Sequence, residues 1–482
     1  MDISKGSRLI ENIKSALLVV LFLLTILLLY LFWGDTPLRG LMGEEQPRYA
    51  AIDPIEIFQP DRIEISFGGG DYTVAGTHHF AAIMEGFSAF SEGGNLLVEE
   101  ITQERYELEV LMRPSIKAVF EYYLPFSALR ELYGIDRIHG ADAIDAVSEL
   151  VYVADFDHLL FVYDRNSDKH FRIVGRSNND FEPVRQIIQD AQRNHVPYHT
   201  LENFMGGTIH NRTLIPVSFE SNLYDIPFSR EDFSRHPDRV TDIVRSFFSD
   251  HFDFVRQIAD ENGTVIYMYG FGRIVVVAHN NGILEFRREL DDRSAAPLTY
   301  LEAFERANSF IAMHGGFSAI GGGMPLTPYI REVVVDPDGN RGFRFVFGIQ
   351  IAGSRVYDQG GHPMVVDVIG DRVTYFQRQL IHVNSNDIRQ ADQGYRQVFL
   401  PVINMIAANT EPIQAALPET QEADAEELSF EAILEKVTRL DVGYVKRDGH
   451  EDTLSAAWIV TIDGLEFYFG LDDGALLGHG LQ

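Results

Sequence analysis

The feature that most constrains this chain is an uncharged, apolar stretch near its beginning. Residues 15–33 read SALLVVLFLLTILLLYLFW, without a single charged side chain. At a rise of about 1.5 Å per residue, a helix of this length spans about 28 Å, close to the hydrocarbon thickness of a bilayer. Tyr30, Phe32 and Trp33 end the stretch with aromatic rings, as is typical of a membrane interface. The sequence therefore predicts a transmembrane helix over residues 15–33.

The charges around this stretch predict its orientation. Lys5, Arg8 and Lys14 precede it, and mostly acidic residues follow it. An excess of lysine and arginine marks the cytoplasmic side, so we expect a cytoplasmic stub over residues 1–14 and the bulk of the chain outside the cytoplasm. A cleaved signal peptide is the alternative. Its apolar region usually has about 7–15 residues and is followed by small residues at a cleavage site, which is not the pattern after Trp33.

The predicted helix could also contact a partner inside the membrane. The candidate partner-contacting residues of this span are Leu18, Phe22, Thr25 and Leu29. Thr25 carries the central hydroxyl of the span, and a threonine can hydrogen-bond across a helix pair. The span has no G-x-x-x-G pattern, and a passive anchor is the alternative interpretation.

Composition limits the classes of function. The chain has no cysteine, which excludes thiol catalysis, disulfides and cysteine-ligated metals. The absence of disulfides fits a bacterial surface protein better than a secreted eukaryotic domain of this size. The formal net charge of −31 would repel phosphate backbones, so we expect no binding to nucleic acid.

Hydropathy patterning predicts an α+β fold, in which the transmembrane helix precedes several extracytoplasmic modules, each a helix plus an antiparallel sheet. The predicted divisions are a linker over 34–53, an α+β domain over 54–230, a central domain of two helix-plus-meander units over 231–408, an acidic linker over 409–427 and a small C-terminal module over 428–482. The last module is short for an independent core, so we expect it to dock onto the preceding domain.

Within the first domain, alternation predicts strands at 55–58 and 62–67, and longer apolar periodicity predicts helices at 80–90, 96–111 and 181–192. Further strands are expected at 116–123, 150–154, 159–163 and 171–174. In the central domain two helices each precede a meander, which suggests a weak internal repeat. Ser234 is a candidate cap for the first helix, and Thr299 and Glu302 have capping-box spacing for the second. The C-terminal helix is expected to present Phe430, Ile433, Leu434 and Val437 on one face.

Pairs of histidines are the first candidates for a metal site. His195 and His199 have the spacing of a metal pair, but Pro197 between them argues against the helix that would align them. His78 and His79 are adjacent and are expected to diverge. We therefore interpret both pairs as fortuitous and predict no metal site.

Other short motifs favour structural interpretations. Residues 336–340 (Asp-Pro-Asp-Gly-Asn) are expected to form a hairpin turn, because the glycine and glutamate positions of a calcium loop are filled by Arg341 and Phe347. Residues 472–474 are interpreted as a turn, and residues 321–323 as a flexible loop. No recognised catalytic motif is present, so we predict no enzymatic activity, no catalytic residues and no cofactor.

The region 240–287 resembles the central region of the YycH regulators. It shares a helix that ends in a phenylalanine pair, Phe247-Phe248, then a hairpin and a short G-x-x-E-[YF] strand at 282–286. Residues 298–380 resemble the next unit of these proteins and of their partner family, YycI. The tail around Ala457-Trp458-Ile459 and Tyr468 is similar to their last unit.

This resemblance implies a function. Such proteins are membrane-anchored extracytoplasmic accessories that bind a WalK-type sensor histidine kinase and associate with YycI. They modulate a two-component system that governs cell-wall metabolism in Gram-positive bacteria, and they carry no catalytic residues. Two alternatives remain: an adaptor that inhibits another envelope enzyme, such as a protease, and a surface-anchored hydrolase of wall polymers, suggested by the location and the 71 acidic residues.

Overall fold

The computed structural model describes most of the chain after residue 48. The residues described are 17–18, 20–25, 49–92, 94–156, 158–176, 181–193, 195–217, 219–221, 223–230, 233, 237–290, 296–317, 326–351, 353–358, 361–383, 396–398, 402–417, 428–446 and 453–481. They fall into two compact units, residues 1–47 and 48–482. Each unit is described by itself.

The first unit contributes a short helical segment. Residues 17–18 and 20–25 are helical, and their large apolar side chains are 52–71% exposed. The hydroxyl of Thr25 donates a hydrogen bond to the carbonyl of Leu21 at 2.8 Å. Among the described residues, no helix is long and apolar enough to cross a membrane. Most of the span 15–33, including Leu29, lies outside them, so the transmembrane helix stays a prediction.

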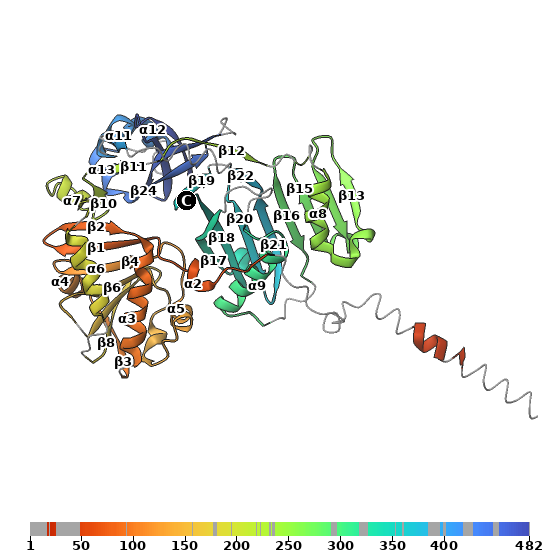
Figure 1. Cartoon of the computed structure of the whole chain (residues 1–482), viewed down its shortest axis with the longest axis horizontal. Coiled ribbons are helices and arrows are strands. Elements are labelled where there is room, and N and C mark those ends of the chain that lie inside the picture. The colour runs from red at the N-terminus through yellow and green to blue at the C-terminus, as the bar shows by residue number, and fades with distance from the viewer. Residues whose placement is uncertain are drawn as a thin grey trace, which may run out of the picture. The chain divides into compact units, whose positions relative to one another are not determined.

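The second unit begins with a mixed, mainly antiparallel sheet. Its described strands follow the order β10-β9-β2-β1-β4-β6-β7-β8-β3-β5 (Figure 1). Their bounds are β1 Arg62–Gly68, β2 Asp71–Ala75, β3 Leu96–Ile101, β4 Pro114–Val119, β5 Ile138–His139, β6 Glu149–Val153, β7 Leu159–Asp164, β8 Lys169–Val174, β9 Tyr198–Thr200 and β10 Leu214–Pro216. Only β3 and β5 pair in parallel among these strands.

Helices α3 (Phe80–Glu92) and α6 (Glu182–Arg193) contact each other, and α6 lies on β1 and β4. Both were expected from apolar spacings of three and four residues, and α3 buries Phe80, Ile83 and Phe87 in this way. Shorter helical segments complete this part of the chain: α2 Pro54–Ile57, η2 Thr77–His79, α4 Gln103–Val110, α5 Phe126–Leu132, η3 Ala141–Ala143 and α7 Leu201–Phe204.

A second sheet contains three groups of strands, each preceded by a helix: α8 (Pro237–Phe248), α9 (Tyr300–Met313) and α13 (Phe430–Glu435). Thr299 and Glu302 form the predicted capping box of α9, whereas Ser234 lies outside the described residues. The described strands follow the order β13-β14-β15-β16-β21-β20-β18-β19-β24-β25-β12-β22, with β17 on β18, and with β26 between β25 and β27.

The bounds of these elements follow the chain. The strands are β12 Ile226–Arg230, β13 Arg256–Ala259, β14 Val265–Tyr269, β15 Ile274–Ala278, β16 Ile283–Arg288, β17 Thr327–Val335, β18 Gly342–Ile351, β19 Ser354–Asp358, β20 Met364–Ile369, β21 Arg372–Gln379, β22 Ile381–Val383, β24 Val437–Lys446, β25 Thr453–Ile462, β26 Leu465–Gly470 and β27 Leu476–Leu481. Strands β11 Phe219–Ser221 and β23 Arg396–Val398 form a separate pair. The remaining helical segments are η4 Ser249–Phe254, η5 Gly270–Gly272, η6 Pro337–Gly339, α11 Val402–Ala408 and α12 Thr410–Ala416.

The C-terminal strands continue the central sheet. β24 pairs in parallel with β19, so that Val356 lies opposite Tyr444 and Asp358 opposite Lys446. β25 pairs on its other side with β12. The last module therefore docks by backbone pairing as well as by side-chain packing.

One apolar core runs from the first sheet into the central strands. The ring of Phe58 lies 5.5 Å from that of Tyr300 and 4.6 Å from that of Phe304, measured between centroids. Asn308 on α9 exchanges two hydrogen bonds with the backbone of Ile52. Residues 49–53, which the sequence assigns to the linker, are thus held against α9.

Two local predictions are wrong, each because a helix cap overrides an apolar pattern. Residues 54–57 form helix α2 instead of a strand, since Asp53 accepts the amide of Ile55 and Pro54 opens the helix. Residues 96–111 are strand β3 followed by helix α4, because Leu96–Ile101 pairs with β8 and Thr102 caps a new helix.

Two further differences concern the end of the chain. Part of the predicted acidic linker, residues 410–416, is helix α12, and Ile413 is buried in the C-terminal core. Residues 418–427 of that linker lie outside the described residues. Val437 begins strand β24 instead of continuing the preceding helix.

The joint between β19 and β24 yields a first prediction. A Cβ at Gly443 would collide with the carbonyl oxygen of Arg355, which is backbone and cannot move aside cheaply. We expect Gly443→Ala to lower the free energy of unfolding by about 1–3 kcal/mol, measured by urea denaturation. Gly94→Ala is the control, because its Cβ would meet only Arg176 at 3.8 Å. Equal effects of the two substitutions would contradict the close approach of the strands.

Candidate functional site

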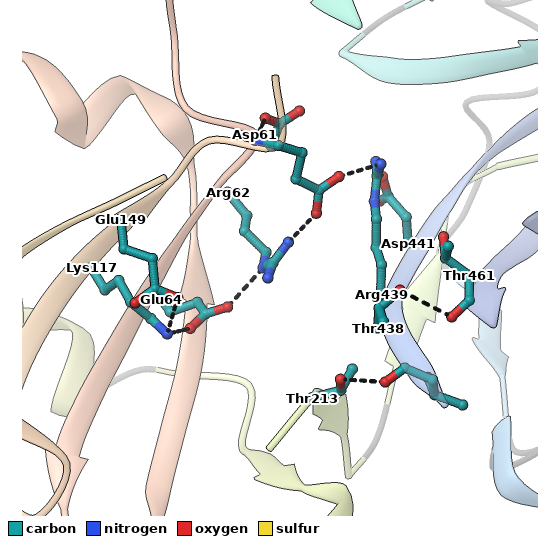
Figure 2. A network of polar contacts seen from close by, with 12 residues as sticks. Asp61, Arg62, Glu64, Lys117, Glu149, Thr213, Thr438, Arg439, Asp441 and Thr461 are labelled. Atoms are coloured by element: carbon teal, nitrogen blue, oxygen red, sulfur yellow. Dashed lines mark hydrogen bonds and ion pairs between the residues drawn. The ribbon is translucent and has the colours of Figure 1, made fainter. Parts of the chain in front are cut away.

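A network of charged side chains lies between the first sheet and the C-terminal strands (Figure 2). Its first half is a row across neighbouring strands. Glu64 on β1 lies directly opposite Lys117 on β4. Lys117 Nζ lies 2.8 Å from Glu64 and 3.4 Å from Glu149 on β6. Arg62 Nε donates to Glu64 at 2.7 Å, which closes the row at one end.

The second half of the network comes from β24. Arg439 donates to Glu121 at 2.6 Å, and also to Asp441 at 2.7 Å and to the hydroxyl of Tyr357 at 2.8 Å. Arg62 donates to the other carboxylate oxygen of Glu121 at 2.5 Å. Glu121 therefore joins the row on the first sheet to the arginine on β24.

A parallel link comes from β19. Arg355 donates to Asp61 at 2.7 Å, and Asp61 in turn accepts the backbone amide of Glu121 at 2.7 Å. The Arg355 guanidinium also lies over the ring of Tyr329, 4.5 Å from its centroid. Arg355 and Arg439 thus each have a carboxylate and an aromatic partner.

The centre of the network is nearly dry. Only 5% of the Asp61 side chain, 11% of Arg355 and 10% each of Glu121 and Arg439 is exposed, whereas Arg62 at the rim is 28% exposed. Salt screens such pairs far less than it screens surface pairs. Ions so placed must compensate one another, because an unpaired buried charge is costly.

The pKa values follow from burial and from these partners. Burial alone would raise the pKa of Glu64, but Lys117 and Arg62 lower it to about 2. Burial likewise opposes ionisation of Glu121, yet Arg439 and Arg62 keep its pKa below the usual value. Asp61 differs, because burial and the nearby Glu121 charge outweigh Arg355 and raise its pKa. At neutral pH the row on β1 and β4 is firmly ionised.

Additional contacts join the C-terminal strands to the rest of the second unit. The side-chain amide of Asn211 donates to the carbonyls of Leu434 and Val437, both at 2.7 Å. Arg331 on β17 donates to Glu466 on β26 at 3.0 Å. Only 10% of the Arg331 side chain and 1% of the Glu466 side chain is exposed. These polar and charged side chains therefore hold the C-terminal strands in position against the rest of the second unit. A partner that separated these strands would have to break several buried pairs at once.

A small cavity lies at the end of β18, lined by Phe347, Met364 and Arg378 among others, with a volume of about 20 Å³. It has room for about one water molecule. Burial lowers the pKa of Arg378 to about 10, and Nη1 of this arginine donates to the carbonyl of His314 at 3.4 Å.

The structure places the histidine candidates as follows. His195 contacts the backbone carbonyl of Gln192 at 3.2 Å through Nδ1, and its ring packs on Phe67. His199 lies in β9. Within the described ranges, no group of three histidine, aspartate or glutamate residues is arranged to hold a metal ion.

The expectation that His78 and His79 diverge is wrong. They lie in the 3₁₀ turn η2, and their ring centroids are 4.0 Å apart. Burial and the charge of His78 lower the pKa of His79.

The two expected turns are confirmed. Residues 336–340 connect β17 to β18, and Asp336 Oδ1 accepts the amide of Gly342 at 3.0 Å. Residues 472–474 connect β26 to β27, with Asp473 Oδ1 accepting the amide of Ala475. Residues 321–323 and the candidate Leu29 lie outside the described residues, and the candidates Leu18, Phe22 and Thr25 are helical.

The network itself was missed from the sequence. The alternation of Arg62-Ile63-Glu64-Ile65 predicts a half-buried strand, but Ile63, Glu64 and Ile65 are all buried. The partners lie too far apart along the chain to be matched by spacing. Arg355 is 294 residues from Asp61, and Arg439 is 318 residues from Glu121.

Comparisons with known proteins place the fold. The sequence matches no family model and no curated protein. The structure matches the crystal structure of YycH from Bacillus subtilis with a TM-score of 0.56 and 10% sequence identity, covering 87% of this chain and 98% of that chain. The predicted resemblance to YycH is therefore confirmed at the level of the fold. The C-terminal domain of YpeB from Bacillus megaterium matches 51% of this chain and 97% of that domain at 14% identity, with a TM-score of 0.25.

Removal of the central arginine should destabilise the protein strongly. Arg439→Met would leave Glu121 short of one cation and Asp441 short of its ion pair, and breaking a buried pair typically costs about 3–5 kcal/mol. We expect a loss of that size in the free energy of unfolding, measured by urea denaturation. Lys169→Met removes an exposed pair with Glu100 and should change stability by less than about 1 kcal/mol. Similar losses in both variants would show that burial of the network has no energetic effect.

The low pKa of Glu64 predicts a dependence of stability on pH. Because the folded pKa of about 2 lies below the usual 4.5, ionised Glu64 stabilises the fold above about pH 4.5, and this contribution is lost as the pH falls toward 2. Its full size is on the order of 3 kcal/mol, of which about 2 kcal/mol is lost by about pH 3.

Urea denaturation between about pH 6 and about pH 3 tests this dependence. Glu64→Gln should flatten the stability curve by about 2 kcal/mol relative to the unsubstituted protein, since a glutamine side chain does not titrate. Parallel curves for the two proteins would contradict the paired, ionised state of Glu64.

Proposed function

We propose, from the fold that this chain shares with YycH, that it is a non-enzymatic, membrane-anchored regulator that acts outside the cytoplasm. The observation that carries the proposal is the match over 87% of this chain and 98% of YycH. The sequence resemblance at 240–287 supports the same conclusion from the residues. The buried charges of the network support a structural role, since they are engaged with one another.

The regulator would bind a sensor histidine kinase, a YycI-like protein, or both. Binding modulates a two-component system that controls cell-wall metabolism in a Gram-positive bacterium. A partner of this kind acts by preferring one kinase conformation, so the size of the effect is set by its difference in affinity for the two states.

Two regions would make the contacts. One is the predicted span 15–33, through Leu18, Phe22, Thr25 and Leu29. Its described part supports this, because its large apolar side chains are at least 52% exposed within their own unit. The other region is the surface of residues 48–482, whose strands are held in one arrangement by the ion-pair network.

In vivo photocrosslinking tests the proposal. A photoreactive residue at Leu18, Phe22, Thr25 or Leu29 of the full chain should capture a histidine kinase or a YycI-like protein. Replacement of residues 15–33 by an unrelated apolar helix should abolish capture and change kinase output, while the outer unit stays folded. This variant is the matched control, because it retains an anchor of the same length.

Other outcomes separate the alternatives. Capture of a different envelope enzyme would favour the adaptor that inhibits such an enzyme. Capture of neither class of partner, together with unchanged kinase output in a strain that lacks the chain, would contradict the proposal. Unchanged output in the helix-replacement variant alone would make the anchor passive and move regulation to the outer unit.

A further inference from the structure

Strand β13 ends the described part of the second sheet, and its side chains are exposed. In the described part of that sheet, β13 pairs only with β14. All four of its residues, Arg256 to Ala259, are exposed, and so are the preceding Phe254, at 74%, and the following Asp260. An edge of this kind is a template for pairing with another strand.

The outer face of the same hairpins is apolar. α8 packs on β15 from the side of Tyr267 and Val276, which are buried (Figure 1). The opposite face presents Ile258 beside Ile266, Ile266 beside Val277, and Met268 beside Val275, in direct cross-strand pairs. Ile258 is exposed and the other four are only partly buried. This face therefore extends to the open edge.

The backbone hydrogen bonds show which groups on β13 point outward. The amide of Asp260 donates to Thr264 on the β14 side at 2.9 Å. Backbone groups alternate in direction along an antiparallel strand, so those of Ile258 and Arg256 also point toward β14. The amides and carbonyls of Gln257 and Ala259 then point to the open edge.

We propose that a second copy of this chain pairs with β13 through its own β13, antiparallel and with Ile258 on the two-fold axis. In this register Gln257 of each copy lies opposite Ala259 of the other, so the outward groups form four backbone hydrogen bonds. Arg256 lies opposite Asp260 of the second copy, and the symmetry produces this pair twice. The strand is thus complementary to itself in charge as well as in hydrogen bonding.

Neighbouring registers lose this complementarity. A shift that centres the axis on Gln257 places Arg256 opposite the uncharged Ile258. It also places Asp253 opposite Glu261, so that two negative charges face each other. A shift that centres the axis on Ala259 places Ile258 opposite Asp260.

Among the described residues Arg256 makes no ion pair within its own chain, so it is available for the second copy. A contact of four residues per strand is small, and the dimer is expected to dissociate on dilution.

The absence of cysteine permits a direct test with the full chain in mild detergent. In the proposed register the two Ile258 residues form a non-hydrogen-bonded pair, whose Cα atoms lie about 4.5 Å apart, within disulfide range. Ile258→Cys should therefore give a disulfide-linked dimer on mild oxidation, detected on a non-reducing gel. Phe271→Cys is the control, because Phe271 is fully exposed at the tip of the β14–β15 hairpin and away from the axis. Its yield should be at least tenfold lower.

Charge reversal tests the register in the Ile258→Cys background. Arg256→Asp and Asp260→Arg should each lower the yield of crosslinked dimer several-fold, because each puts like charges opposite one another. An equal mixture of the two variants should restore the yield, since the introduced aspartate of one copy then faces the introduced arginine of the other. Arg341→Asp, at an exposed turn between β17 and β18, makes the same change of net charge as Arg256→Asp and should have no effect.

Three outcomes would overturn the dimer. These are no crosslink at residue 258, equal yields at residues 258 and 271, and no recovery when the two charge variants are mixed. The mixing experiment stays decisive even if one charge reversal disturbs the turn that Asp260 forms with Asn262. The reason is that the crosslinking yield of the mixture is compared with the yield of each variant alone.

Discussion

The arrangement of the second unit depends on charges that have been removed from water together. Arg439 and Glu121 are each only about a tenth exposed, so an unpaired charge at either position would be costly. Tyr357 and Asp441 accept hydrogen bonds from Nη2 of Arg439, and Arg62 donates to the second oxygen of Glu121. Such a network adds little net stability compared with an apolar core, but it strongly disfavours any arrangement that separates the partners. Its effect is therefore to fix how the C-terminal strands meet the first sheet.

The rest of the architecture is consistent with that constraint. β19 and β24 must pair closely enough for Arg355 and Arg439 to reach Asp61 and Glu121, and Gly443 permits this close approach. An apolar core joins the first part of the unit to the central strands through Phe58, the residue that follows α2, and the rings of α9. Backbone pairing thus joins the central and C-terminal strands, apolar packing joins the first part of the unit to α9, and the buried charges join the first sheet to both β19 and β24. This arrangement suits a protein that presents a fixed surface to a partner, as the proposed regulatory function requires.

The sequence predicts a structural element correctly where the residues that determine the element are neighbours along the chain. The Thr299–Glu302 capping box, the apolar spacing of α3 and the turn at 336–340 depend only on neighbouring residues, and all three were predicted. The resemblance to YycH was also visible, because the order of helix and meander survives at 10% identity. Local apolar patterns predict the wrong element where an N-cap residue starts a helix, as Asp53 and Thr102 do.

The network could not be predicted, because its residues meet only through the strand order. Nothing near Arg439 in the sequence indicates that its partner is Glu121. The open edge of β13 could not be predicted either, because the sequence pattern predicts no strand at residues 256–259. Both features require knowledge of which strands are neighbours.

Native-state hydrogen exchange at increasing urea concentration tests most directly whether the buried charges join the first sheet and the C-terminal strands into one cooperative unit. If they do, amides of β1 and β4 and amides of β24 and β25 will open with the same free energy and the same dependence on urea. If β24 and β25 open at distinctly lower urea while β1 and β4 stay protected, the two parts are independent, and the network does not have the role assigned to it.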